Sequence, residues 1–176
     1  INELDFSSLN KLNVAIAFSL NKLLLLLSES YGEKMETQNI KNEYNRASHS
    51  VGISMWHFEW CTKYRYKMFK KQEYLKLAEA CIRRAASLHK ITIIEISVMP
   101  EHVHIVIQIS LNLSPAKALN ILKGLSAKLF FEHHEKARLR YPRGHLWSPG
   151  KFAASLGFIQ IETAKEYVRN QIEHHY

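Results

Sequence analysis

Two histidines stand one residue apart in the stretch "PEHVHIVIQI", residues 100–109. Successive side chains of a β-strand point to opposite faces, so a strand over 102–109 puts His102 and His104 on one face, about 7 Å apart along the strand. Val103 and Ile105 then belong to the opposite, apolar face. Two imidazoles at this spacing can bind one metal ion; the alternative is a pair of half-exposed strand histidines without a ligand.

A tyrosine and a glutamine stand four residues apart near the end of the chain, in "IETAKEYVRNQIEHH". At helical spacing, Tyr167 and Gln171 share a face. A tyrosine hydroxyl can attack phosphorus and form a covalent phosphotyrosine, and the side-chain carbonyl oxygen of Gln171 is a neutral ligand for a hard cation. Imidazole and amide ligands with bound water suit Mn²⁺ or Mg²⁺ in phosphate chemistry. The alternative is that Tyr167 packs on the core and Gln171 is solvated.

Other histidine, tyrosine and cysteine positions are weaker candidates for chemistry. The adjacent histidines of "EHHEK" and "EHHY" point about 100° apart on a helix and chelate a metal poorly. Tyr176 is a second candidate nucleophile, but no glutamine follows it at helical spacing. Cys61 and Cys81 form no CxxC pair, which excludes a four-cysteine zinc site and indicates two thiols in a reducing cytoplasm.

The spacing of apolar residues and turn formers predicts the elements that must position these side chains. Ser114 is the expected N-cap of a long helix, with Pro115 at its first position. We expect strands at 51–60, 91–98, 102–109 and a short one at 145–147, and helices at 70–90, 114–137 and 161–175. This order predicts an α+β fold, a ferredoxin-like or RRM-like sandwich in which an antiparallel sheet carries two helices on one face. The last helix, which carries Tyr167, is an addition to that sandwich.

The chain divides by composition into an extension, residues 1–34, and a single domain, residues 35–176. The formal charge of +8 resides in the domain, because the extension is slightly acidic. We expect the domain to begin at Met35. An apolar segment at 12–27 is interrupted by Asn21 and Lys22, which makes it too short to predict a membrane span.

A basic domain of this size favours a nucleic-acid partner, and the alternative is a basic protein without one. Basic and aromatic residues that suit phosphates and stacked bases occur in three blocks of the sequence. The candidate DNA-binding residues are Lys63, Tyr64, Arg65, Lys123, Lys128, Arg143, His145 and Trp147.

Four blocks of the sequence, in this order, resemble the HUH single-tyrosine transposases of small bacterial and archaeal insertion sequences. They are "HFEWCTKYRYKMF" (57–69), "SVMPEHVHIVIQI" (97–109), "LKGLSAKLFFE" (122–132) and "GHLWSPGKFAASLGFIQIETAKEYVRNQ" (144–171). Val103 supplies the bulky apolar residue between the two histidines. The extension is not part of the family pattern.

The resemblance implies a role for each candidate residue. His102, His104 and Gln171 are expected to bind Mg²⁺ or Mn²⁺, and Tyr167 to be the nucleophile that cleaves single-stranded DNA and stays joined to the 5′ phosphate, without ATP. The family also implies a homodimer that binds subterminal hairpins, with composite active sites in which the last helix serves the partner. Gly157 is then the hinge before that helix; the alternative is a simple turn glycine.

Three other functions remain open on the sequence. One is a non-catalytic single-stranded nucleic-acid-binding module on the same sandwich, which would bind bases through exposed aromatic residues of the sheet. The second is a host-adopted HUH nuclease that processes palindromes. The third is a replication initiator, which often carries two catalytic tyrosines and further domains.

Overall fold

The structure is a computed structural model that describes residues 45–47, 49–157 and 160–170. The chain divides into two compact units, Ile1–Asn42 and Glu43–Tyr176, and all described residues belong to the second. The predicted boundary after residue 34 and the apolar segment at 12–27 therefore lie outside the described residues. Within the described part, no helix is long and apolar enough to cross a bilayer.

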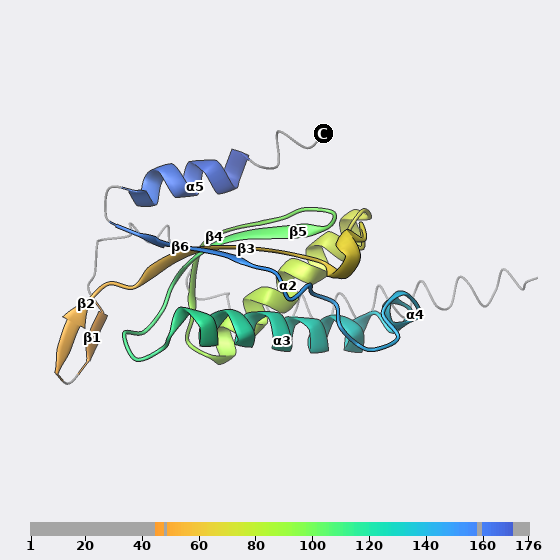
Figure 1. Ribbon diagram of the computed structural model, residues 1–176, viewed down its shortest axis with the longest axis horizontal. Helices are drawn as coiled ribbons and strands as arrows, with labels where there is room; N and C mark the ends of the chain where they lie inside the picture. The colour runs from red at the N-terminus through yellow and green to blue at the C-terminus, as the bar shows by residue number, and fades with distance from the viewer. Residues whose placement is uncertain (1–44, 48, 158–159, 171–176) are drawn as a thin grey trace, which may run out of the picture. The chain divides into compact units, whose positions relative to one another are not determined.

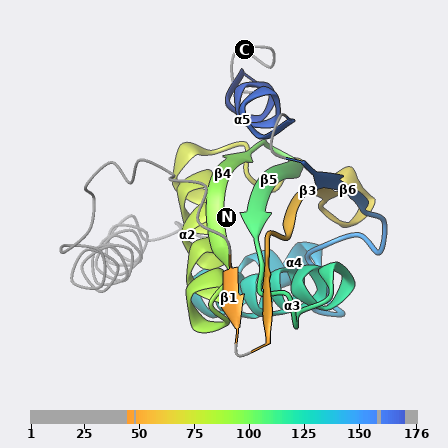
Figure 2. The same ribbon diagram turned by 90° about the vertical axis from the view of Figure 1, so that its left-hand side faces the viewer.

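A four-stranded antiparallel sheet forms the centre of the second unit (Figures 1 and 2). Its strands are β3 (Met55–Cys61), β4 (Thr92–Val98), β5 (His102–Gln108) and β6 (Phe152–Leu156). They lie in the order β4-β5-β3-β6, and every neighbouring pair is antiparallel. Two short strands, β1 (Asn45–Ala47) and β2 (Ser50–Gly52), precede the sheet in the sequence and pair with each other.

Two helices, α2 (Gln72–Leu88) and α3 (Pro115–His133), cover one face of the sheet, and α5 (Gln160–Asn170) lies over the other (Figure 1). The short helices η1 (Lys63–Arg65) and α4 (Ala137–Arg140) follow β3 and α3. The order β-α-β-β-α-β with this strand arrangement is the ferredoxin-like sandwich that the sequence predicts. Ser114 caps α3 as expected, because its side chain accepts a hydrogen bond from the backbone N–H of Lys117.

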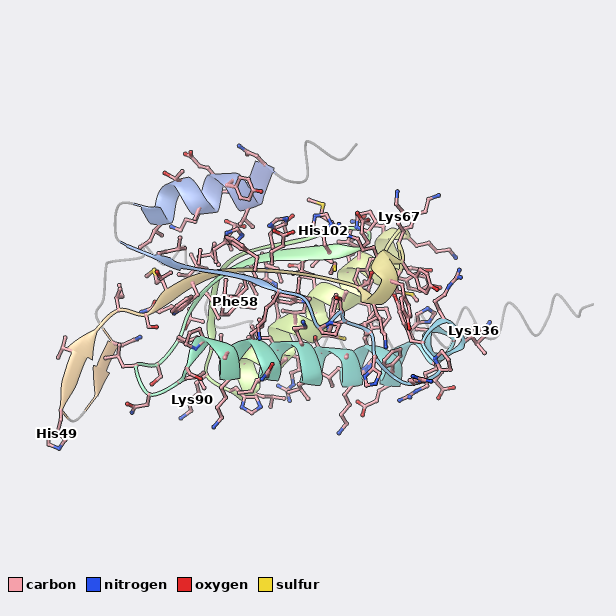
Figure 3. All side chains as sticks on the ribbon, viewed as in Figure 1. His49, Phe58, Lys67, Lys90, His102 and Lys136 are labelled. Carbon is pink, nitrogen blue, oxygen red and sulfur yellow. The ribbon has the colours of Figure 1, made fainter. Side chains whose placement is uncertain are left out.

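The apolar face of the sheet packs against α2 and α3. Val103, Ile105 and Ile107 of β5 are fully buried there, together with Phe58 and Trp60 of β3. Figure 3 shows Phe58 on the helix side of the sheet and His102 on the opposite side. Burial of each such side chain stabilises the fold by about 1.5–3 kcal/mol, so this face fixes the orientation of the sheet.

Two predicted strands differ from the structure. The strand expected at 145–147 is wrong: Trp147 makes only an isolated bridge with Thr62, and the fourth strand is β6, which begins at Phe152. Pro149 and Gly150 separate the two, and proline cannot donate to a strand ladder. The strand expected at 51–60 is divided into β2 and β3, and α4 was not predicted.

Cys81 provides a test of the packing between α2 and α3. Burial, with a smaller effect of Glu132, raises the pKa of the Cys81 thiol to about 12, so it stays protonated in the folded protein. We expect a thiol reagent such as dithiobis-nitrobenzoate at about pH 8 to label half-buried Cys61 in the native state and Cys81 only after unfolding. Labelling of Cys81 at the same rate in native and unfolded protein would contradict this packing.

Candidate active site

His102 and His104 lie on the face of the sheet that α2 and α3 leave uncovered. In the register of β3 and β5, Glu59 is opposite His104 and Cys61 is opposite His102. Ser97 of β4 is opposite His104 on the other side, and Phe152 of β6 is opposite Glu59. Cross-strand partners point to the same face, so one row of side chains runs Ser97, His104, Glu59, Phe152. Both histidines are buried, with 7 % and 3 % of their surfaces exposed, unlike ordinary half-exposed strand residues.

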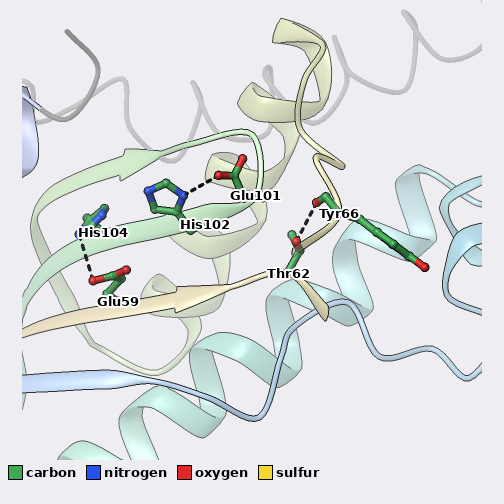
Figure 4. Close-up of polar contacts among 6 residues, drawn as sticks. All are labelled: Glu59, Thr62, Tyr66, Glu101, His102 and His104. Atoms are coloured by element: carbon green, nitrogen blue, oxygen red, sulfur yellow. Dashed lines mark hydrogen bonds and ion pairs between the residues drawn. The ribbon is translucent and has the colours of Figure 1, made fainter. Parts of the chain in front are cut away.

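Carboxylates lie beside both imidazoles (Figure 4). Glu101 Oε1 is 3.5 Å from His102 Nδ1, and Glu59 Oε2 is 3.9 Å from His104 Nδ1. A third histidine, His57, places its Nε2 atom 3.4 Å from His104 Nδ1. Burial lowers the pKa of His57, and the Glu59 carboxylate offsets part of that effect. Glu59 and His57, both of β3, thus lie next to the Nδ1 atom of His104.

Tyr167 of α5 lies over the same histidines. Its ring centroid is 5.8 Å from that of His104 and 5.9 Å from that of His57. Among the residues of the helix whose burial is described, Ile161 and Val168 are buried, whereas half of the Tyr167 surface is exposed. Arg169 donates to Glu95 Oε2 of β4 at 3.1 Å, which ties the end of the helix to the sheet. In this structure, α5 therefore covers the histidines of its own chain.

The donor set suits a divalent metal but is incomplete within the described residues. The rings of His102 and His104 are 5.1 Å apart and nearly perpendicular. Metal-bound histidines commonly direct their other ring nitrogen at a carboxylate, as both Nδ1 atoms do here. No three histidine, cysteine or acidic side chains of the described segments are placed to hold one ion. A further ligand is needed, and the expected one, Gln171, lies outside these segments.

The histidines and the tyrosine open into one hollow of about 550 Å³. Its lining residues are Glu59, Arg65, Lys67, Glu101, His102, His104 and Tyr167. Arg65 and Lys67 come from the turn after β3 and bring two cations to the hollow. Cations next to a tyrosine hydroxyl and two imidazoles form a site that can bind and polarise a phosphate group.

Five of the eight predicted DNA-binding residues line a second hollow, of about 700 Å³, between α3 and the segment before β6. They are Lys63, Lys123, Lys128, His145 and Trp147. Arg138 also lines it and was not predicted, and no acidic residue does. Tyr64 and Arg65 lie instead on the turn after β3, and of the two only Arg65 lines the hollow of the histidines. Arg143 is exposed outside both hollows, so the structure does not bring it together with the rest.

Lys123 and Trp147 have structural contacts in this second hollow. Lys123 Nζ donates to the carbonyl oxygens of Ser148 at 2.6 Å and Gly150 at 3.2 Å. Burial, followed by the charge of Lys151, lowers the pKa of Lys123. Trp147 is buried, and its indole N–H donates to Ser126 Oγ at 3.0 Å. Both residues hold the segment that leads into β6.

His57, Glu59, Lys67 and Glu101 are site residues that the sequence reasoning missed. Period-two alternation in 55–61 already puts His57 and Glu59 on one face, opposite buried Phe58. Their nearness to His104 depends on the β3–β5 register, which the sequence does not specify. Gly157, the predicted hinge, is exposed between β6 and α5, and a Cβ added there would meet nothing within 4 Å.

The chain is similar to known proteins in both sequence and fold. Residues 50–171 match the family model described as "Transposase IS200 like". The chain is 27 % identical over 116 residues to the ISDra2 transposase TnpA of Deinococcus radiodurans, which covers 66 % of this chain and 82 % of the relative. It is 22 % identical over 128 residues to the transposase for insertion sequence element IS200 of Salmonella typhimurium, covering 72 % and 82 %.

Two solved structures share the fold. One is a Deinococcus radiodurans R1 protein described as a candidate transposase, with a TM-score of 0.58 and 22 % identity over 72 % of this chain and 97 % of that one. The other is a REP-associated tyrosine transposase bound to a REP hairpin, with a TM-score of 0.52 and 15 % identity, covering 76 % and 74 %.

The contacts of Lys123 predict a stability effect that other lysines of the same helix lack. Lys123→Met removes two charge-assisted hydrogen bonds to backbone carbonyls, and we expect it to lower the free energy of unfolding by about 1–3 kcal/mol. Lys128→Met is the matched control: Lys128 is exposed, its ion-pair partner within the described part of the chain is Glu132 at 3.9 Å, and the variant should change stability by less than about 0.5 kcal/mol. Chemical denaturation measures both, and equal effects of the two variants would refute the structural role.

Proposed function

The chain belongs to the IS200-like transposase family, and we propose that it cleaves and rejoins single-stranded DNA at insertion-sequence ends through a 5′-phosphotyrosine intermediate. The observation that carries the proposal is the position of Tyr167, a half-exposed hydroxyl-bearing side chain whose ring lies beside that of His104. The hollow below it contains two imidazoles and two cations, which suits a phosphodiester.

In the proposed reaction the Tyr167 oxygen attacks phosphorus. The Oη–P bond forms as the bond from phosphorus to the 3′ oxygen breaks, the tyrosine gives up its proton, and the leaving 3′ oxygen gains one. Because the phosphotyrosine keeps the energy of the phosphodiester, a 3′ hydroxyl can reverse the step and seal a new junction without ATP. Arg65 and Lys67 bind the charged phosphate oxygens in this scheme.

His102 and His104 would hold the divalent metal, with Gln171 as the third protein ligand. A bound Mg²⁺ or Mn²⁺ supplies charge that polarises a phosphate oxygen. Glu101 and Glu59 would act on the imidazoles rather than on DNA: by attracting their Nδ1 sides they would orient the rings.

The DNA partner we propose is a subterminal hairpin with a single-stranded flank. The second hollow, lined by Lys63, Lys128, Arg138 and His145 and by no acidic residue, suits the backbone of such a hairpin. The likeness to a transposase bound to a REP hairpin supports this choice. We also propose that the protein acts in the cytoplasm as a homodimer, in which Gly157 serves as the hinge that brings α5 to the partner's histidines.

The nucleophile is tested by a covalent adduct. Wild-type protein incubated with Mn²⁺ and end-labelled hairpin oligonucleotides from the flanks of its gene should yield a labelled band that survives denaturing electrophoresis. Tyr167→Phe removes the attacking oxygen and should abolish this band, while DNA affinity measured by gel shift stays near that of wild type. An adduct formed by Tyr167→Phe would refute the assignment, and absence of any adduct with wild type would favour a non-catalytic binding module.

The metal ligands are tested without reference to activity. We expect wild type to bind Mn²⁺ in titrations followed by electron paramagnetic resonance, and His102→Ala and His104→Ala each to weaken binding by about tenfold or more, because each removes one direct ligand. Gln171→Ala should weaken it as well. His89→Ala, at the exposed end of α2, is the control. Equal Mn²⁺ affinity of wild type and the His102 and His104 variants would contradict the proposed metal site.

A further inference from the structure

A third hollow, of about 490 Å³, adjoins the hollow of the histidines and has no part in the reaction described above. Two exposed aromatic residues line it: Tyr64, with 69 % of its surface exposed, and Phe152, with 49 %. Arg65 and Lys151 also line it. Its volume lies in the range of about 300–1,000 Å³ that small-molecule sites occupy. Exposed aromatic rings flanked by cations suit a planar, apolar group attached to an anion.

The third hollow is continuous with the hollow of the histidines. Glu59 and Arg65 line both hollows. The cross-strand row explains this, because Glu59 stands between His104 and Phe152 in the sheet. The backbone N–H of Thr62, which precedes the Tyr64 turn, donates to the carbonyl oxygen of Glu101 at 2.7 Å, so the turn is bonded to the residue next to His102. A strand whose phosphate lies in the hollow of the histidines can therefore place its neighbouring nucleotide in the third hollow.

The backbone that presents Tyr64 is strained. Tyr64 and Arg65 have φ values of 63° and 51°, in the left-handed region that non-glycine residues seldom occupy. Hydrogen bonds enforce this turn: Thr62 Oγ1 donates to the carbonyl oxygen of Tyr66 at 2.7 Å (Figure 4), and the backbone N–H of Lys63 donates to that of Leu146 at 2.8 Å. Two consecutive left-handed residues typically persist where the conformation serves a function. Here the conformation exposes the Tyr64 ring at the third hollow. Lys63 Nζ lies 5.2 Å from the centroid of that ring.

We propose that this third hollow binds a nucleobase of the single strand next to the scissile phosphate, with Tyr64 and Phe152 as its stacking surfaces. Arg65 and Lys151 bind the phosphates on either side of that nucleotide. The inference rests on the proposed function, because it needs a phosphodiester in the adjacent hollow. It adds a determinant of where the strand is cut: the base is held by rings on η1 and β6, not by the hairpin surface along α3.

The test separates base binding from phosphate binding. Full-length protein is titrated, in EDTA so that no cleavage occurs, with two fluorescein-labelled probes of about 20 nucleotides: a mixed-sequence single strand, and an abasic tetrahydrofuran-phosphate polymer of the same length. Because stacking on an aromatic side chain strengthens binding by about tenfold per base, we expect wild type to bind the DNA about tenfold more tightly than the abasic polymer.

The variants are chosen so that folding and stacking give different results. Tyr64→Asn removes the ring but tolerates the left-handed backbone, so its melting temperature should stay at or above that of wild type while its affinity for DNA falls about tenfold. Phe152→Leu should weaken DNA binding in the same direction, and Tyr64→Phe should behave like wild type. All of them should bind the abasic polymer as wild type does. Leu88→Ala, a truncation of an exposed apolar residue at the end of α2, is the matched control and should change neither affinity.

Three results would overturn the inference. One is equal affinity of wild type for DNA and abasic polymer. The second is a loss of affinity for both probes in the Tyr64 and Phe152 variants. The third is a change only in the oligomeric state of these variants on gel filtration, which would make the rings a protein contact. An intact Tyr167 adduct together with any of these results leaves the proposed function standing. Base-dependent binding without any adduct would contradict the proposed catalysis and would still support the nucleobase site.

Discussion

The pairing of β3 with β5 is the constraint on which the rest of the structure depends. Its register sets Phe58 against Ile105 and Trp60 against Val103 on the helix side, and Glu59 against His104 on the other. Side chains alternate with a period of two, so a slip of one residue would turn the whole of β3 over. Phe58 and Trp60 would then leave the core, which makes the slip very costly. Core packing thereby fixes the position of the Glu59 carboxylate beside His104.

The same register explains why polar groups can be buried on the face of the sheet opposite α2 and α3. His102 and His104 are as inaccessible as core residues, and burial of polar groups costs free energy unless they have partners. Carboxylates supply those partners from two directions: Glu59 comes across from β3, and Glu101 from the turn that joins β4 to β5. Phe152 extends the row at the edge of the sheet, where its ring contacts that of His57 with centroids 5.5 Å apart. The row thus runs from an imidazole through a carboxylate to an exposed aromatic ring across three strands.

Local patterns in the sequence predict what depends on local geometry. Alternation in 102–109 is sufficient to put the two histidines together, and Ser114 with Pro115 is sufficient to start α3. Properties that depend on pairing between distant segments are not accessible in this way. Phe152 was expected in a loop because the segment before it is rich in Gly and Pro. Nothing local indicates that a strand begins at Phe152 and pairs with β3. Tyr64 was expected near DNA from composition, but nothing local indicates a left-handed backbone at a tyrosine, because hydrogen bonds from Thr62 and to Leu146 impose it.

The attachment of α5 differs in kind from that of α2 and α3. Helices α2 and α3 bury continuous apolar stripes against the sheet. In α5, by contrast, the buried side chains among those described are those of Ile161 and Val168. The Arg169–Glu95 pair is largely exposed on the arginine side, and exposed ion pairs contribute about 0–1 kcal/mol. The imidazoles proposed to bind the metal therefore lie on the sheet that α2 and α3 hold, and the proposed nucleophile lies on the helix with few buried side chains. The proposed reaction, which first forms and later releases a bond to Tyr167, suits this division, because the tyrosine can move with the DNA while the imidazoles and carboxylates keep their positions.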